Sequence, residues 1–205
     1  MSAIAVPARR PVLADAVLPR ATWLTDLALV LGGAAFVALL AQVTIPLPIV
    51  PITGQTLAVI VVGASLGARR GAAALVAYLL AGLAGAPVFA GLTGSIAAVA
   101  TPSFGFILGF IPAAFVAGAF AERSWDRRSW KAFVGFVAAS IVPFLVGVPY
   151  MAMILNVVLG AQYDLAGILQ VGVTPFILGG LVKAAIAAVL IPLAWRGVRA
   201  VDERA

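Results

Sequence analysis

Long apolar runs separated by short polar connections dominate this chain of 205 residues. A helix needs about 17 to 25 apolar residues to cross the hydrocarbon core of a bilayer. Read in this way, the sequence predicts an all-α integral membrane protein with six transmembrane helices. The predicted helices cover residues 23–43, 54–66, 71–85, 104–121, 130–159 and 175–195. They form one membrane domain, 22–196, between an N-terminal tail, 1–21, and a C-terminal tail, 197–205.

Arginine and lysine gather at every second connection between the predicted helices. Arg69 and Arg70 separate the second and third helices, and four cations separate the fourth and fifth. The connections 44–53, 87–103 and 160–174 contain no lysine or arginine. Because cytoplasmic loops carry the excess of these residues, the pattern predicts that both termini are cytoplasmic and these three connections are extracellular.

The composition removes several classes of function. Hydrophobic residues make up 64% of the chain and charged residues 10%, whereas about a quarter of a soluble domain is charged. Cysteine and histidine are both absent, so thiolate metal sites and imidazole bases are unavailable, and we expect neither a metal site nor an enzyme. The net charge of +6 comes from helix ends rather than from one soluble face, which argues against a nucleic-acid partner.

The segment 45–56, Ile-Pro-Leu-Pro-Ile-Val-Pro-Ile-Thr-Gly-Gln-Thr, interrupts the helical pattern. Its three prolines fix φ and lack an N–H. Irregular backbone at membrane depth is tolerated where protein buries it or where it lines a cavity, so we expect a structured loop over a pocket. The connections 87–103 and 160–174 are expected to complete this lid, and Asp164 can cap a short helix through Gln170. The alternative is that all three simply join helices.

Lys183 is the cation that the predicted spans leave inside the membrane. It lies nine residues beyond Thr174, roughly 14 Å from the outer end of its helix. An intramembrane ammonium is costly unless paired or hydrated, and no carboxylate of the sequence is placed to neutralise it, so a ligand is the expected partner. Gly179 and Gly180 share its helical face and leave room for that ligand. Close helix packing through small residues is the alternative for the glycines.

Several motifs in order resemble those of BioY, the biotin-binding S-components of energy-coupling-factor (ECF) vitamin transporters. The resemblance rests on the proline segment, on Leu-Gly-Ala-Arg-Arg-Gly at 66–71, Pro-Val-Phe-Ala-Gly at 87–91, Thr-Pro-Ser-Phe-Gly-Phe-Ile-Leu-Gly-Phe at 101–110 and Pro-Phe-Ile-Leu-Gly-Gly-Leu-Val-Lys at 175–183. It implies an outward-facing biotin pocket in a bacterial-type plasma membrane. It also implies uptake driven by a transmembrane coupling protein and ABC-type ATPases, since this chain has no phosphate-binding loop of its own. No cofactor is expected.

The first predicted site is the one that binds biotin. Gln55 offers donors and an acceptor that suit a cyclic urea, and aromatic rings suit the fused ring of biotin. The candidate biotin contacts are Lys183, Gln55, Thr53, Phe89, Gly91, Thr93, Tyr150 and Gly180. For Thr53 helix capping is the alternative, and for the aromatic residues core packing.

The resemblance is incomplete at Gly180, where BioY proteins commonly have an aspartate. The loss of this acceptor leaves open a shifted substrate preference.

A second predicted site lies on the first predicted helix, where Ala34 and Ala38 belong to a small-residue stripe. The resemblance implies that this stripe docks on the coupling protein, and packing within the bundle is the alternative. An S-component for another vitamin, an intramembrane enzyme and a structural membrane subunit are the remaining alternatives for the whole chain.

Overall fold

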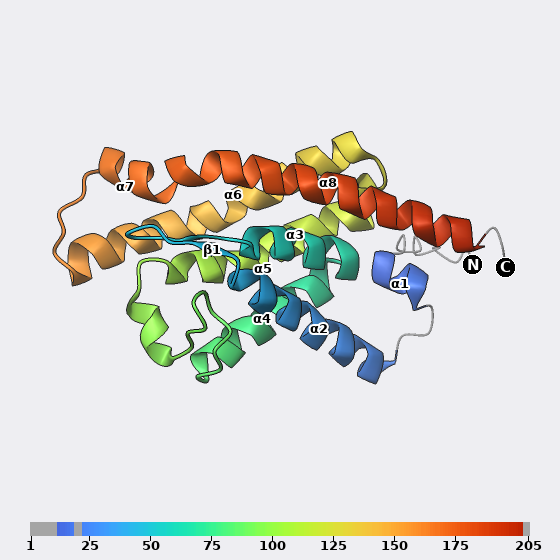
Figure 1. The fold of residues 1–205 in the computed structure, drawn as a ribbon, viewed down its shortest axis with the longest axis horizontal. Helices are drawn as coiled ribbons and strands as arrows, with labels where there is room; N and C mark the ends of the chain where they lie inside the picture. The colour runs from blue at the N-terminus through green and yellow to red at the C-terminus, as the bar shows by residue number, and fades with distance from the viewer. Residues whose placement is uncertain (1–11, 19–21, 203–205) are drawn as a thin grey trace, which may run out of the picture.

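A computed structural model describes residues 12–18 and 22–202 and shows a bundle of helices with one short hairpin (Figure 1). Each of the six predicted segments contains a helix. These helices are α2 (Trp23–Ala41), α3 (Gln55–Leu66), α4 (Ala68–Leu83), α5 (Phe104–Glu122), α6 (Ser129–Met153) and α8 (Thr174–Asp202). The helix α6 continues beyond Met153 as the π-helix η3 (Ile154–Val158), and α8 extends past its predicted end. Two short helices, α1 (Leu13–Val17) and α7 (Leu165–Gly172), precede α2 and α8.

Four helical segments of the described chain are long and apolar enough to cross a membrane. They are Trp23–Ala41, Phe104–Glu122, Ser129–Val158 and Leu165–Ala200. The helix α3 has 12 residues, a length of about 18 Å, and therefore falls short of a hydrocarbon core of about 30 Å. The helix α4 has 16 residues and begins with two arginines in its first turn. The prediction of six spans therefore stays a prediction, while the six helices themselves are present.

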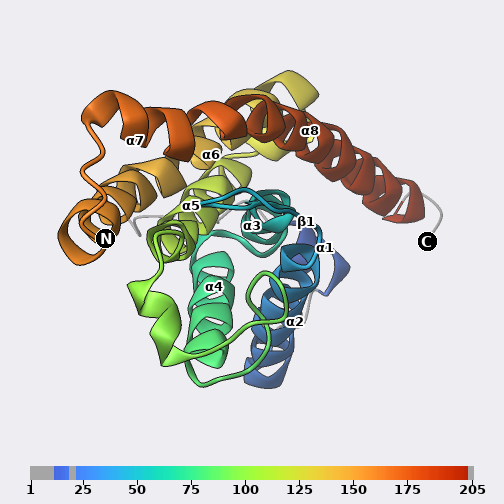
Figure 2. The ribbon, with the colours of Figure 1, turned by 60° about the vertical axis from the view of Figure 1, so that its left-hand side comes forward.

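The helix α5 lies at the centre of the bundle, against α3, α4 and α6. Glycines allow the backbones of these neighbouring helices to come into direct contact. A Cβ on Gly63 of α3 would lie 2.4 Å from the carbonyl oxygen of Ala114, and one on Gly109 of α5 would lie 2.7 Å from the Cα of Pro143. The helices α6 and α8 run side by side along the long axis of the molecule, and α2 and α4 cover the opposite side (Figures 1 and 2).

All three connections predicted to be extracellular have a defined structure. The proline segment forms a hairpin in which β1 (Thr44–Ile45) pairs antiparallel with β2 (Ile52–Thr53). The second connection contains an isolated bridge between Phe89 and Thr93 and a 3-10 helix, η1 (Ile96–Ala100). In the third, Asp164 caps α7 by accepting a hydrogen bond from the N–H of Gly167 at 2.8 Å, so the predicted cap is confirmed.

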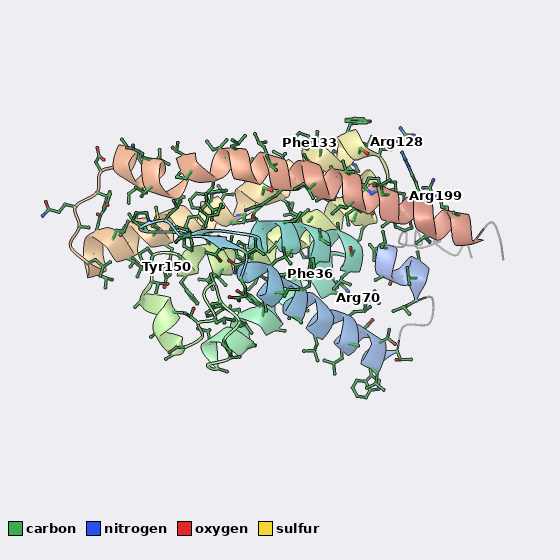
Figure 3. The ribbon with its side chains drawn as sticks, in the orientation of Figure 1. Phe36, Arg70, Arg128, Phe133, Tyr150 and Arg199 are labelled. Carbon is green, nitrogen blue, oxygen red and sulfur yellow. The ribbon has the colours of Figure 1, made fainter. Side chains whose placement is uncertain are left out.

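The opposite end of the bundle carries most of the arginines. Figure 3 shows Arg128 and Arg199 there, near the C-terminal end of α8. The guanidinium of Arg70 forms ion pairs with Asp15 of α1 and Asp26 of α2, so one side chain joins three helices. The helix α8 continues to Asp202, and the part of the predicted C-terminal tail that the structure describes is therefore helical. Most of the predicted N-terminal tail, residues 1–11 and 19–21, lies outside the described residues.

A buried carboxylate connects the turn between α5 and α6 to α8 at this end. Asp126 lies in the short helix η2 (Trp125–Arg127), has 1% of its surface exposed and accepts a hydrogen bond from the indole N–H of Trp195. The guanidinium of Arg127 lies over the Trp195 ring, 4.4 Å from its centroid. Burial raises the pKa of the Asp126 carboxyl above its ordinary value, and the Trp195 hydrogen bond and the charge of Arg127 oppose this rise only in part.

Candidate functional site

A cavity of about 440 Å³ lies beneath the hairpin, at the end of the bundle away from the arginine-rich turns. Its wall combines the hairpin residues 50–53 and the second connection with the first turn of α3 and parts of α5, α6 and α8. Two connections and four helices thus meet around one space. Its volume is in the range of pockets that hold small organic ligands.

Lys183 of α8 forms part of the wall and crosses to the hairpin. Its Nζ donates hydrogen bonds to the backbone carbonyl of Thr53 at 2.6 Å and to the hydroxyl of Thr56 at 3.0 Å. The two ion pairs described above belong to Arg70, and Lys183 is instead bound by these two oxygens. An ammonium has three donors, and the third remains for a group in the cavity.

Gln55, at the start of α3, is held at both ends of its side-chain amide. The hydroxyl of Thr53 donates to Oε1 at 2.7 Å, and Nε2 donates to the hydroxyl of Tyr78 at 2.7 Å. Gln55 lines the cavity although only 5% of its surface is exposed. One N–H and one lone pair of the amide remain for a ligand. Together Lys183, Thr53, Thr56 and Gln55 form what we call the polar wall of the cavity.

Aromatic side chains form much of the remaining surface. Phe89 lines the cavity and is 4% exposed, because its ring fills the space above Gly82, where a Cβ would lie 2.1 Å from the ring. Phe106 of α5 stacks on Phe176 of α8 with ring centroids 6.3 Å apart. Phe144 of α6 packs against both rings. The cavity therefore combines this polar wall with a mainly apolar and aromatic lining, in which Thr93, Ser95, Thr101, Ser103 and Ser140 add further hydroxyls.

Open space adjoins Gly179 and Gly180. A Cβ added at either residue would meet no heavy atom within 4 Å, and both residues line the cavity. These glycines therefore leave room beside Lys183 instead of bringing two helices together, which was the alternative interpretation of the sequence. Thr93 also lies on the cavity wall, and its hydroxyl donates to the carbonyl of Ala90 at 3.1 Å.

Comparison with known proteins assigns the chain to a family. The family described as the BioY family matches residues 12–200. The chain belongs to the BioY family. Biotin transporter BioY2 of Lactococcus lactis subsp. cremoris is 35% identical over 166 residues, which are 80% of this chain and 86% of that protein. Biotin transporter BioY of Rhizobium etli is 36% identical over 69% of this chain and 75% of its own length.

A solved structure shares the fold of this BioY family member. It is the S-component for biotin from an ECF-type ABC transporter, with a TM-score of 0.63 and 22% sequence identity over 86% of this chain and 95% of that chain. At this identity the comparison supports the helical architecture alone. The resemblance to BioY inferred from sequence motifs is confirmed by the family match.

Two of the residues predicted for the site of this BioY chain lie outside the cavity wall. Tyr150 packs against Phe104 with ring centroids 6.0 Å apart, and its hydroxyl donates to the carbonyl of Val99 (Figure 3). Its Cβ lies against Gly105, so the side chain joins α6 to α5. Gly91 has a φ of +72° in the turn between Phe89 and Thr93 and is likewise not a lining residue. The described connection 160–174 contributes no lining residue either.

The structure adds lining residues that the sequence analysis did not single out. Among them are Phe106 and Phe110 of α5 and Ser140 and Phe144 of α6. Each pair is four residues apart, which places its members on one helical face. In helices that are apolar all round, this spacing gives no contrast between the cavity side and the lipid side, so the pattern alone does not identify them.

The proposed docking stripe of this BioY chain is turned partly inward. Ala34 and Ala38 are half-buried and pack against the core, and Ala41, the next residue of the stripe, is fully buried. The exposed large side chains of the same stretch of α2 are Phe36 and Leu39, with 37% and 66% of their surface exposed.

Proposed function

We propose that this BioY family member is the biotin-binding S-component of an ECF-type ABC transporter. The observation that carries the proposal is the cavity, in which one polar wall adjoins an aromatic lining beneath two structured connections. Biotin has the same division, a cyclic urea fused to an apolar ring that continues as an aliphatic chain. The relatives named as biotin transporters support the same ligand.

The polar wall supplies the hydrogen bonds that such a ligand requires. The free N–H and lone pair of the Gln55 amide match the carbonyl and N–H on one edge of a urea. The third donor of Lys183 binds a ligand oxygen, with the strength of a charge-assisted hydrogen bond. Phe89 and the ring pair Phe106 and Phe176 pack against the apolar part of the ligand.

The proposed topology has six membrane helices, cytoplasmic termini and an outward-facing cavity. Along α8 the cavity residues lie in the first half, ending at Lys183, and the arginines lie in the last turns, at Arg196 and Arg199. The same order holds from Phe106 in α5 to Arg123, which directly follows that helix. The positive-inside rule therefore supports a cytoplasmic location for the arginine-rich end and an extracellular location for the cavity.

Energy for uptake comes in this proposal from partner subunits. The sequence has no Gly-x-x-x-x-Gly-Lys-[Ser/Thr] loop, and a transmembrane coupling protein with ABC-type ATPases would supply ATP hydrolysis. The half-buried Ala34 and Ala38 leave the adjacent surface of α2 as the proposed docking face for that coupling protein.

A binding titration tests the proposal. The purified protein in lipid nanodiscs should bind biotin saturably at nanomolar to micromolar concentration and should not bind thiamine or riboflavin. Absence of biotin binding would overturn the proposal. Binding of one of the other two vitamins would instead support the alternative, an S-component of different specificity, which the open space beside Gly180 favours.

A further inference from the structure

We propose that Tyr78 is a positioning residue for ligand recognition, whose hydroxyl fixes the orientation of the Gln55 amide. The inference rests on the proposed function, in which Gln55 contacts the ligand. Tyr78 lies on α4, behind the polar wall, and is not itself a lining residue. It acts on the ligand through Gln55.

The hydroxyl of Tyr78 is buried and faces Gln55. Tyr78 is 1% exposed and is among the largest fully buried side chains. Within residues 12–18 and 22–202 its one hydrogen-bond partner is the side chain of Gln55, at 2.7 Å. A phenolic hydroxyl in an apolar interior is costly unless it is hydrogen-bonded. Core packing alone would be served equally by phenylalanine, so the oxygen at this position is explained by Gln55.

The amide of Gln55 needs such a constraint because the last torsion of a glutamine side chain has a broad energy profile. Thr53 binds the amide oxygen and Tyr78 binds the amide nitrogen, which fixes the plane of the amide and the edge that faces the cavity. Without Tyr78 the amide would be held at one end and could turn its free N–H away from the ligand.

The position of the Tyr78 ring is itself fixed by packing. The ring meets Phe89 edge to face, with centroids 5.5 Å apart and an interplanar angle of 71°. Phe89 is in turn confined by Gly82, one turn beyond Tyr78 on α4. Tyr78 therefore supports one polar and one aromatic residue of the cavity wall, and only the polar contact depends on its oxygen.

The variant Tyr78→Phe separates these two contacts because it keeps the ring and removes the oxygen. We expect it to raise the Kd for biotin about three- to tenfold, the range for a single neutral hydrogen bond. In a Gln55→Ala background the same substitution should change Kd by less than twofold, because the hydroxyl acts through Gln55. A purely structural role would weaken binding equally in both backgrounds.

Tyr163→Phe is the matched control, since it deletes the same atom from a tyrosine outside the cavity wall, and its Kd should stay within twofold of the parent. A parent-like Kd for Tyr78→Phe, or an equal loss in the Gln55→Ala background, would overturn the inference. If the parent binds thiamine or riboflavin and not biotin, the proposed function fails. Titrating the parent, the two single variants at Tyr78 and Gln55, the double variant and the control with that vitamin then tests Tyr78 separately.

Discussion

Replacing Lys183 with methionine tests the centre of the proposed site. The substitution preserves the length and much of the volume of the side chain and removes its charge and its three donors. Within the protein it removes the hydrogen bonds to the carbonyl of Thr53 and to the hydroxyl of Thr56. Thr53 and Thr56 both line the cavity, where water can take the place of the ammonium.

The expected loss of affinity follows from the one donor that Lys183 retains for the ligand. A hydrogen bond that involves a charged group contributes about 1.5 to 3 kcal/mol, which corresponds to an increase in Kd of about 10- to 150-fold. The stability of the empty protein should change much less, because methionine also removes the unfavourable burial of a charge. Binding and stability are therefore expected to separate in this variant.

Isothermal titration with biotin and thermal unfolding of the empty protein, both in nanodiscs, measure the two quantities. The control is Lys131→Met, the same change at the other lysine of the chain, which lies in the first turn of α6 outside the cavity wall. A Kd for Lys183→Met within twofold of the parent, in a protein that unfolds at the parental temperature, would refute the role assigned to the ammonium.

Three further substitutions give distinct outcomes. Gly180→Asp should fit without a clash and lower the Kd for biotin severalfold, because it adds an acceptor for urea N–H groups beside Lys183; a higher Kd in titration would contradict this. Asp126→Asn should unfold at a higher temperature than the parent at neutral pH. Burial raises the pKa of Asp126, so the cost of its charge is present above that pKa and disappears as the pH falls through it, and the advantage of the variant should shrink toward pH 4. Ala38→Leu should bind biotin within twofold of the parent but reduce biotin uptake by the assembled transporter; unchanged uptake would argue for a packing role alone.

The sequence predicted the helices well because apolar length is a strong signal. The ends of α3 and α5 lie within one residue of the predicted bounds. The larger difference is at α8, which continues past 195 to Asp202, since its arginines are compatible with a helix that leaves the membrane. The proline segment was predicted as structured but not as a hairpin, because a pairing of two residues on each strand leaves no alternating pattern to read.

Lys183, Gln55 and Thr53 of the polar wall were predicted for the site, whereas Phe89 was the one aromatic lining residue predicted. Lys183 and Gln55 stand out because ionisable and amide groups are costly in an apolar environment. Phe106 and Phe144 look like any other apolar residue of a membrane helix. Tyr150 was predicted for the site on residue type alone, and the structure places it between α5 and α6 because Gly105 leaves space for its side chain.

Lys183 reaches the hairpin through the main-chain oxygen of Thr53, whereas Gln55 depends on the Thr53 side chain. Every residue has a main-chain oxygen, whereas few residues have a side-chain hydroxyl. During evolution, replacement of Thr53 can therefore alter how the amide is held while the attachment of α8 to the hairpin persists. A change of vitamin preference in a descendant of this protein could begin at position 53 without a loss of architecture.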